Sequence, residues 1–191
     1  MRIISGTFRG RRLQAPPGQG TRPTTDRVRE ALFNVLGGSV AGRKVLDCYA
    51  GSGALGIEAL SRGAGSAVFV EKGRQAAEVV RSNLALVGLQ RSEIAQVVQR
   101  PLEKSLGTLQ ALGPFDLWLV DPPFAMVRDG TSITALAAMV RAGLLAEGGL
   151  VVLEYPSDQE CPVIQGLQSE DIRHYGDSRL VIYGPTTAEG S

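Results

Sequence analysis

The chain has 191 residues, of which 43% are hydrophobic and 20% charged, and this length and apolar content predict one domain with a full core. No apolar run approaches a membrane span and the first residues lack the apolar region of a secretion signal, so a membrane protein is excluded and a cytoplasmic one expected. Cys48 and Cys161 lie far apart in no metal-binding spacing, which excludes a disulfide framework and a zinc site.

Positive charge is concentrated at the start of the chain. Residues 1–30 contain seven arginines against Asp26 and Glu30, a balance of +5 that leaves −4 for the rest of a chain with net charge +1. Arginine without lysine, next to glycine, favours bidentate contact with phosphate. We therefore predict nucleic-acid contacts through Arg2, Arg9, Arg11, Arg12 and Arg22.

The N-terminal part predicts an appendage followed by a helix. Residues 2–6 and 11–15 indicate two short strands of a basic hairpin, and the prolines and glycines after them form a linker, so this extension covers about residues 1–20. Thr24 or Thr25 can cap the next helix, which ends at a glycine pair. We expect the extension to present charge at the edge of the main domain.

Strands and helices alternate from Lys44 onward. Strands are predicted at 44–48, 66–71, 94–98, 115–121 and 149–155. Helices are predicted directly after the glycine-rich stretch 51–56, at about 75–87, within 101–112 and at 131–145. Residues 122–130 are predicted to form a loop. This alternation predicts an α/β fold with a mostly parallel sheet, helices on both faces and ligands at the carboxyl ends of the strands.

In the C-terminal part of the sequence the alternation of strands and helices ends. Two strand-like runs within 168–184 predict an antiparallel hairpin at one sheet edge, which brings the sheet to seven strands. We expect the domain to cover residues 1–186 and the tail, 187–191, to be frayed.

Residues 44–56 combine a buried strand, an acid and a glycine-rich loop that leads directly into a helix. Its glycines let the backbone approach a ligand closely, and the first N–H groups of the helix point into the same space. The loop satisfies the dinucleotide pattern GxGxxG, but Asp47 before it would repel a pyrophosphate. A carboxylate here suits the sulfonium and amino group of S-adenosylmethionine; alternatively, Asp47 caps the following turn.

Two more acids fall at predicted strand ends. Glu71 follows Gly51 by 20 residues, the spacing at which an acid can accept both ribose hydroxyls of NAD or of S-adenosylmethionine. Asp121 opens a DPPF sequence, in which two prolines remove two backbone donors. The Asp121 carboxylate and the Pro122 carbonyl thus make adjacent acceptors that suit an exocyclic NH2 group.

The DPPF sequence predicts methyl transfer to a base amine. Such an amine is a poor nucleophile because its lone pair is delocalised into the base. Acceptors that hold both protons pull the nitrogen toward sp3 geometry and aim the lone pair at a methyl donor. Phe124 would stack on the flat face of the base. Alternatively, DPPF is a rigid turn with a core phenylalanine.

The chain resembles the class I S-adenosylmethionine-dependent methyltransferases, whose fold is Rossmann-like. DCYAGSGALG matches their first motif, FVEKGRQA the second, and DPPF the motif of enzymes that methylate exocyclic base nitrogens. More closely, RIISGTFRGRRL, RPTTDRVREALFN, AGSGALGIEALSRGA and VDPPF are similar to the RsmD family, the 16S rRNA guanine-N2 methyltransferases. The resemblance runs from Arg2 to about Tyr155.

The resemblance implies an enzyme that methylates N2 of one guanine in 16S rRNA, within the 30S subunit or its assembly intermediate. For the mechanism we expect direct in-line methyl transfer with no metal and no covalent intermediate. The cofactor site for the amino-acid end and the ribose of S-adenosylmethionine would comprise Asp47, Ala50, Gly51, Gly53 and Glu71. The catalytic residues would be Asp121, Pro122 and Phe124. The chain departs from the family after its third strand, where a polar residue often binds adenine, so that contact would depend on the Leu102 backbone N–H and apolar packing.

Three alternatives stay open. An adenine-N6 methyltransferase would use the same DPPF sequence, although the chain is too short for the target-recognition domain of such DNA enzymes. An NAD-dependent oxidoreductase would explain GxGxxG and Glu71 but not Asp47 or DPPF, and the single histidine, His174, lies in a predicted edge strand. A non-catalytic RNA-binding module would explain the arginines alone. Because no extra apolar face is evident, we expect a monomer.

Overall fold

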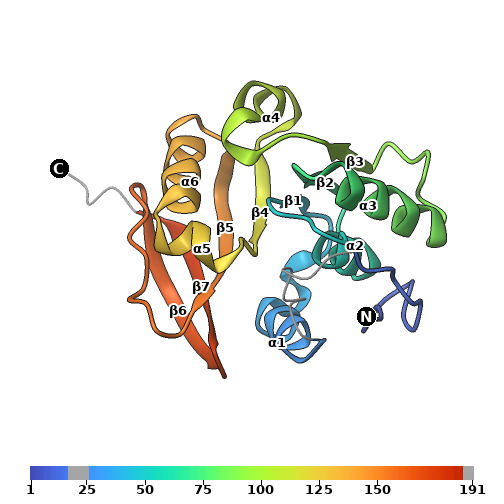
Figure 1. Cartoon of the computed structure of the whole chain (residues 1–191), viewed down its shortest axis with the longest axis horizontal. Coiled ribbons are helices and arrows are strands. Elements are labelled where there is room, and N and C mark those ends of the chain that lie inside the picture. The colour runs from blue at the N-terminus through green and yellow to red at the C-terminus, as the bar shows by residue number, and fades with distance from the viewer. Residues whose placement is uncertain (17–25, 187–191) are drawn as a thin grey trace.

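The computed structural model describes residues 1–16 and 26–186 and contains a seven-stranded sheet of order β3-β2-β1-β4-β5-β7-β6 (Figure 1). The strands are β1 Lys44–Asp47, β2 Ser66–Val70, β3 Ala95–Val98, β4 Phe115–Val120, β5 Leu145–Pro156, β6 Leu167–Tyr175 and β7 Ser178–Pro185. The first five strands pair in parallel, whereas β7 pairs antiparallel with both β5 and β6. The predicted Rossmann-like sheet with an antiparallel C-terminal hairpin is confirmed.

Helices cover both faces of this sheet (Figure 1). One face packs against α1 Asp26–Leu36, α2 Ala54–Ser61 and α3 Arg74–Leu86, and the other against α4 Leu106–Leu112, α5 Phe124–Arg128 and α6 Thr131–Arg141. Two 3-10 turns, η1 Gly37–Val40 and η2 Leu102–Lys104, complete the described helices. Within the described ranges, no helix is long and apolar enough to cross a membrane.

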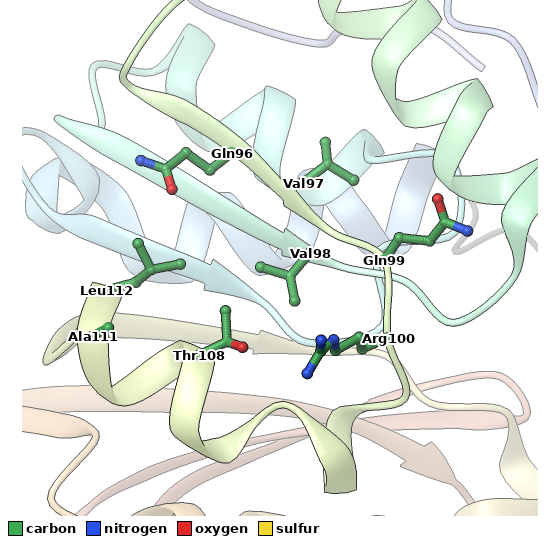
Figure 2. A pocket seen from close by; sticks show the side chains of 8 residues that line it. All are labelled: Gln96, Val97, Val98, Gln99, Arg100, Thr108, Ala111 and Leu112. Atoms are coloured by element: carbon green, nitrogen blue, oxygen red, sulfur yellow. The ribbon is translucent and has the colours of Figure 1, made fainter.

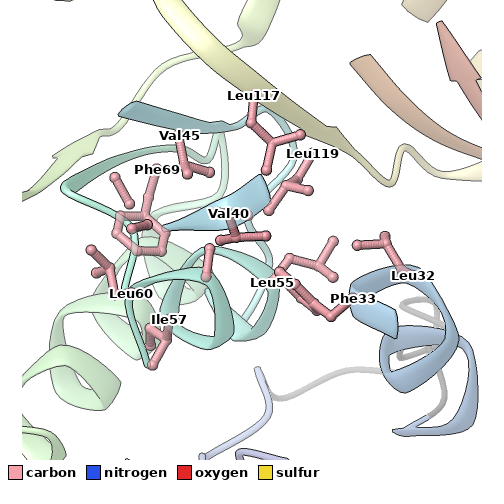
Figure 3. Close-up of a cluster of buried hydrophobic side chains, with 14 of the residues drawn as sticks. Leu32, Phe33, Val40, Val45, Leu55, Ile57, Leu60, Phe69, Leu117 and Leu119 are labelled. Carbon is pink, nitrogen blue, oxygen red and sulfur yellow. The ribbon is translucent and has the colours of Figure 1, made fainter. Parts of the chain in front are cut away.

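Alternation along the strands divides the core into two layers. Val45, Phe69 and Leu119 point to the first face, where they pack with side chains of α1 and α2 such as Phe33 and Ile57 (Figure 3). Their strand neighbours point to the other face, so that the fully buried Trp118 packs with the layer of α4–α6. Because both faces are covered, these strands are apolar throughout rather than alternating with polar residues.

The N-terminal segment pairs with itself as the predicted hairpin does, but it packs on the core instead of projecting as an appendage. Its pairing consists of one antiparallel bridge, Arg2 with Arg12, and a few flanking backbone bonds rather than two full strands. Ile3 and Leu13 are buried in the core layer of α1–α3. Long-range packing determines the position of this segment, because its apolar side chains can be buried only by contact with residues elsewhere in the chain. The predicted linker from residue 17, the caps Thr24 and Thr25, and the tail 187–191 lie outside the described residues.

Two predictions about the second half are also corrected. The predicted loop 122–130 contains α5, which starts directly after Pro123; proline is tolerated at a helix start because its missing N–H would have no partner there. The predicted helix 131–145 ends at Arg141, since Gly143 has a φ of +72° and reverses the chain. The released Leu145 then pairs with β4, so β5 begins four residues before the predicted strand.

Candidate active site

A cleft of about 520 Å³ opens at the carboxyl ends of the parallel strands, where an α/β sheet is expected to bind ligands. It is lined by residues from the loop after β1, the end of β2, the turn η2 and the start of α5. Of the predicted site residues, the cleft brings together Ala50, Gly51, Glu71, Leu102, Asp121, Pro122 and Phe124. Residues about 70 positions apart in the sequence, such as Gly51 and Asp121, therefore line the same cavity.

The glycine loop after β1 has the geometry that the pattern predicts. Gly51 and Gly53 have φ values of +55° and +78°, which other residues rarely adopt. A Cβ atom on Gly56 would lie 2.4 Å from the Phe69 ring, so glycine lets α2 pack directly on β2. The loop is thus fixed from below by packing and presents its backbone to the cleft.

Asp47 lies beneath this loop rather than in the lining of the cleft. Its side chain is buried, and its carboxylate accepts the N–H of Gly56 at 3.0 Å, in the first turn of α2. Burial raises the pKa of the Asp47 carboxyl to about 7, the Gly56 N–H acts in the opposite direction, and the negative charge of Glu71 adds to the rise. The turn-capping role is therefore present, and contact with a cofactor stays a prediction, as it does for Gly53.

Glu71 connects the cleft to the glycine loop. Its carboxylate accepts the N–H of Gly51 at 2.9 Å through one oxygen and the N–H of Gly73 at 2.7 Å through the other. Each carboxylate oxygen has two acceptor sites, so these bonds orient the group and leave it able to accept ribose hydroxyls. Its predicted role in ribose binding stays a prediction.

The DPPF segment forms the opposite side of the cleft. Pro122 is buried, whereas Asp121 and Phe124 are half-buried and line the cavity. Phe124 begins α5, and the guanidinium of Arg128, one turn later, lies 6.0 Å from the centre of its ring. Leu102, the predicted adenine contact, is buried and begins η2 at the same cleft.

Several residues that line the cleft were missed by sequence reasoning. Tyr49 follows Asp47 closely, and its hydroxyl is buried without a hydrogen-bond partner among the described residues. Glu103 and Glu154 add two carboxylates, of which Glu154 is buried. A charged residue within the apolar run GLVVLEY was a usable signal for Glu154, whereas nothing local singled out the others.

The N-terminal segment is part of the cleft as well. Met1, Ala15 and Pro16 line it, and the Ser52 hydroxyl contacts the sulfur of Met1 at 3.2 Å. The buried Asn83 of α3 donates to the carbonyls of Gln14 and Ser52, which ties the segment to the glycine loop.

Buried polar groups of α2 hold the rest of this segment. Glu58 is fully buried and accepts the N–H groups of Ile4 at 2.7 Å and Ser5 at 3.0 Å, and it pairs with Arg62 at 2.7 Å. Of the predicted RNA contacts, Arg22 lies outside the described residues, and the exposed ones are Arg2, Arg9, Arg11 and Arg12. The segment is thus anchored to the core, and its arginines face solvent.

A second hollow of about 430 Å³ lies at the sheet edge (Figure 2). It is lined from β3 and the residues after it by Gln96, Val97, Val98, Gln99 and Arg100, and from α4 by Thr108, Ala111 and Leu112. Arg100 also lines the cleft, but none of the predicted site residues lies in this hollow. Another hollow, of about 470 Å³ between η2 and α6, shares Leu102 with the cleft, but Asp121, Pro122 and Phe124 line only the cleft among these three cavities.

Comparison with known proteins agrees with this geometry. The sequence family described as conserved hypothetical protein 95 matches residues 1–184. The chain is 37% identical to YlbH of Bacillus subtilis strain 168, provisionally named an rRNA methyltransferase, over 96% of this chain and 98% of that protein. It is also 37% identical to ribosomal RNA small subunit methyltransferase D of Escherichia coli K12, over 86% and 79% of the two chains.

A solved structure shows the same fold over the whole length. The Escherichia coli protein yhhF, provisionally named a methyltransferase, superposes with a TM-score of 0.81 at 35% identity, over 97% of each chain. Similarity of this extent includes both the glycine loop and the DPPF segment, which the cleft brings together. The chain therefore belongs to the RsmD family of rRNA methyltransferases.

Proposed function

We propose that this protein transfers a methyl group from S-adenosylmethionine to the N2 amine of a guanine in 16S rRNA of the small ribosomal subunit. Methylation of ribosomal RNA is the activity in the names of its relatives. The observation that supports the finer assignment is the cleft, because one cavity contains both the glycine loop with Glu71 and the DPPF segment.

The charge of the cleft fits S-adenosylmethionine better than a dinucleotide. Four carboxylates line it, against the cations Lys72 and Arg100. The carboxylates are Glu71, Glu103, Asp121 and Glu154. An acidic lining favours a sulfonium and an ammonium group and opposes a pyrophosphate. When bound, S-adenosylmethionine supplies an electrophilic methyl group; Gly51 and Glu71 would hold it, with Leu102 against the adenine.

The DPPF segment supplies the geometry that methyl transfer to an amine requires. The Asp121 carboxylate and the Pro122 carbonyl would accept the two protons of N2 and aim the nitrogen lone pair at the methyl carbon. As N2 forms its bond to that carbon, the bond between the carbon and the sulfonium sulfur would break and S-adenosylhomocysteine would leave. The amine would then give up one proton, to Asp121 or to water. Phe124 would stack on the base and hold its plane in the cleft.

The N-terminal arginines would hold the RNA outside the cleft. Met1, Ala15 and Pro16 line the cleft, whereas the turn that carries Arg9 and Arg11 contacts Ser61 and Leu86, at the ends of α2 and α3 away from the cleft. These exposed arginines would therefore bind RNA that extends beyond the cleft. Arginine binds phosphate by charge and by paired donors. We propose that the substrate is the 30S subunit or its assembly intermediate, in the cytoplasm, and that the enzyme acts as a monomer.

Methyl incorporation from labelled S-adenosylmethionine tests this proposal on three parallel substrates: 30S subunits that lack the modification, deproteinised 16S rRNA and duplex DNA. We expect label in the 30S subunit that digests to N2-methylguanosine. Label recovered as N6-methyladenosine in RNA, or as N6-methyladenine in DNA, would show that the target base is adenine rather than guanine and would leave the proposed cofactor unchanged. No label in any substrate would contradict the proposal.

A further inference from the structure

Glu154 is a carboxylate in an unexpected place. It lies near the carboxyl end of β5, where the residues on either side of it are fully buried and apolar, and its own side chain is 6% exposed. It nevertheless lines the cleft that contains the DPPF segment. Burying a carboxylate costs free energy, which a site that must recognise a polar group can offset when that group binds.

The sheet places Glu154 beside Asp121. Strands β4 and β5 are neighbours in the sheet (Figure 1) and pair in register through Val120 and Leu153. Glu154 and Asp121, the residue directly after β4, follow this last pair. Neighbouring strands lie about 4.8 Å apart. Both residues line the cleft, and the site therefore has two acidic residues on adjacent chain segments at the place where the base amine is expected.

Strand β7 fixes the direction of the Glu154 carboxylate. The hydroxyl of Ser178 donates to Oε1 of Glu154 at 2.6 Å, and Ser178 is itself buried, with 2% of its surface exposed. The bond joins β5 to the antiparallel hairpin, which the topology inserts next to β5. A buried donor of this kind limits the rotamers of Glu154, whose Oε1 is held at the β7 side of β5.

We infer that Glu154 accepts the N1–H of the target guanine while Asp121 and the Pro122 carbonyl hold the N2 amine; this inference rests on the proposed function. Guanine presents N1–H and N2–H donors next to each other, so two adjacent carboxylates match its edge. Adenine has an acceptor at N1, which a carboxylate repels. Glu154 is thus a specificity-determining residue for a DPPF sequence that by itself accepts either amine.

A substrate analogue separates the two contacts. 2-Aminopurine keeps the N2 amine but has an acceptor in place of N1–H. We would reconstitute 30S subunits whose 16S rRNA carries guanine or 2-aminopurine at the position that the label identifies, and measure kcat/KM for each. The ratio of the two values is the discrimination of the enzyme.

Glu154→Gln should lower this discrimination at least about tenfold relative to the wild type, because the amide can donate to N1 of 2-aminopurine. Glu147→Gln, an exposed carboxylate on the same strand, is the matched control and should leave the ratio unchanged. Ser178→Ala keeps the carboxylate but removes its donor. It should lower the ratio in the same direction and by less, and it keeps the inference testable if Glu154→Gln does not fold.

The outcomes distinguish this inference from the function on which it rests. If the wild type does not methylate guanine N2, the proposed function is wrong. If the wild type methylates guanine N2 and the ratio is the same in the wild type, Glu154→Gln and Ser178→Ala, the function stands and the inference is wrong. Binding of S-adenosylmethionine by each variant, followed by calorimetry, should match the wild type, and a loss there would instead assign Glu154 to the cofactor.

Discussion

The two sides of the cleft use acidic residues differently. On the cofactor side, which comprises the glycine loop with Asp47 and Glu71, the carboxylates accept backbone N–H groups of Gly51, Gly56 and Gly73. On the target side, which comprises Asp121–Phe124 and Glu154, prolines stiffen the backbone and the side chains line the cavity. The acids on the cofactor side thus fix the backbone of the glycine loop, whereas we propose that those on the target side hold the substrate amine.

Asp121→Ala tests the target side and should have the largest effect on activity. Loss of an acceptor aimed at the reacting amine should lower kcat by about 100- to 1,000-fold. Because Asp121 is half-buried at the cleft, the melting temperature and RNA binding should change little. Radiolabel incorporation, thermal unfolding and RNA titration measure the three quantities, with Asp171→Asn on the remote strand β6 as the control. Equal activity of the two variants would contradict the proposed role.

Asp47→Asn tests the cofactor side through the pH dependence of stability. The folded protein keeps this carboxyl protonated up to a pKa of about 7, whereas an unfolded aspartate ionises near 3.8. The folded state therefore binds more protons between these values, and its free energy of unfolding falls as pH rises from about 4 to 7, by up to about 4 kcal/mol from this group. Asparagine does not ionise, so the variant should lack that fall.

Urea unfolding at pH 4.5, 6 and 8 measures this difference in the protein without cofactor. The exposed Glu147→Gln variant should follow the wild type, because that carboxylate is not buried. Parallel pH profiles for the wild type and Asp47→Asn would show that the Asp47 carboxyl is ionised in the folded state, against the expectation from its burial.

Gly56→Ala and Gly107→Ala compare two helical glycines. A Cβ on Gly56 would lie 2.4 Å from the Phe69 ring, so this change should destabilise the cofactor side by about 1–3 kcal/mol. Gly107 in α4 has nothing within 4 Å of such an atom, and alanine there should stabilise the protein by about 0.5–1 kcal/mol. Urea unfolding gives both values, and the same sign for both would contradict the packing argument.

Phe124→Ala should remove base stacking on the target side. The expected loss is about 1–3 kcal/mol in transition-state stabilisation, measured as kcat/KM on 30S subunits. Phe124→Tyr keeps an aromatic face and should retain most of the activity. If alanine and tyrosine behaved alike, Phe124 would be a packing residue of α5 rather than a stacking platform.

Single replacements of Arg9, Arg11 or Arg12 by alanine extend the comparison outside the cleft and should have the smallest effects. Each lost phosphate contact should reduce the salt dependence of RNA affinity, the slope of log K against log salt, by about 0.7–0.9. The rate at saturating substrate should stay at the wild-type value. An unchanged slope for all three variants would show that the N-terminal segment does not contact RNA.

Much of the fold was predictable because its signals are local. The apolar run before Asp47, the glycines after it and the acids at strand ends depend on neighbours within a few residues, and the sheet and the cleft appeared where these patterns placed them. The chemistry predicted for the DPPF segment likewise depends on only four consecutive residues. Local backbone preference and apolar alternation suffice for such elements.

Three features were decided only by tertiary structure. The N-terminal segment is held by the buried Glu58 and Asn83, more than 50 residues away, so no local pattern distinguishes it from a hairpin that projects as an appendage. Asp47 looks like a cofactor ligand in the sequence but also caps α2 beneath the loop. Glu154 reaches the same cleft as Asp121 because β5 pairs with β4, and Ser178 binds it because β7 lies between β5 and β6. Sequence determines which elements form, and the order in which they pair determines which side chains meet.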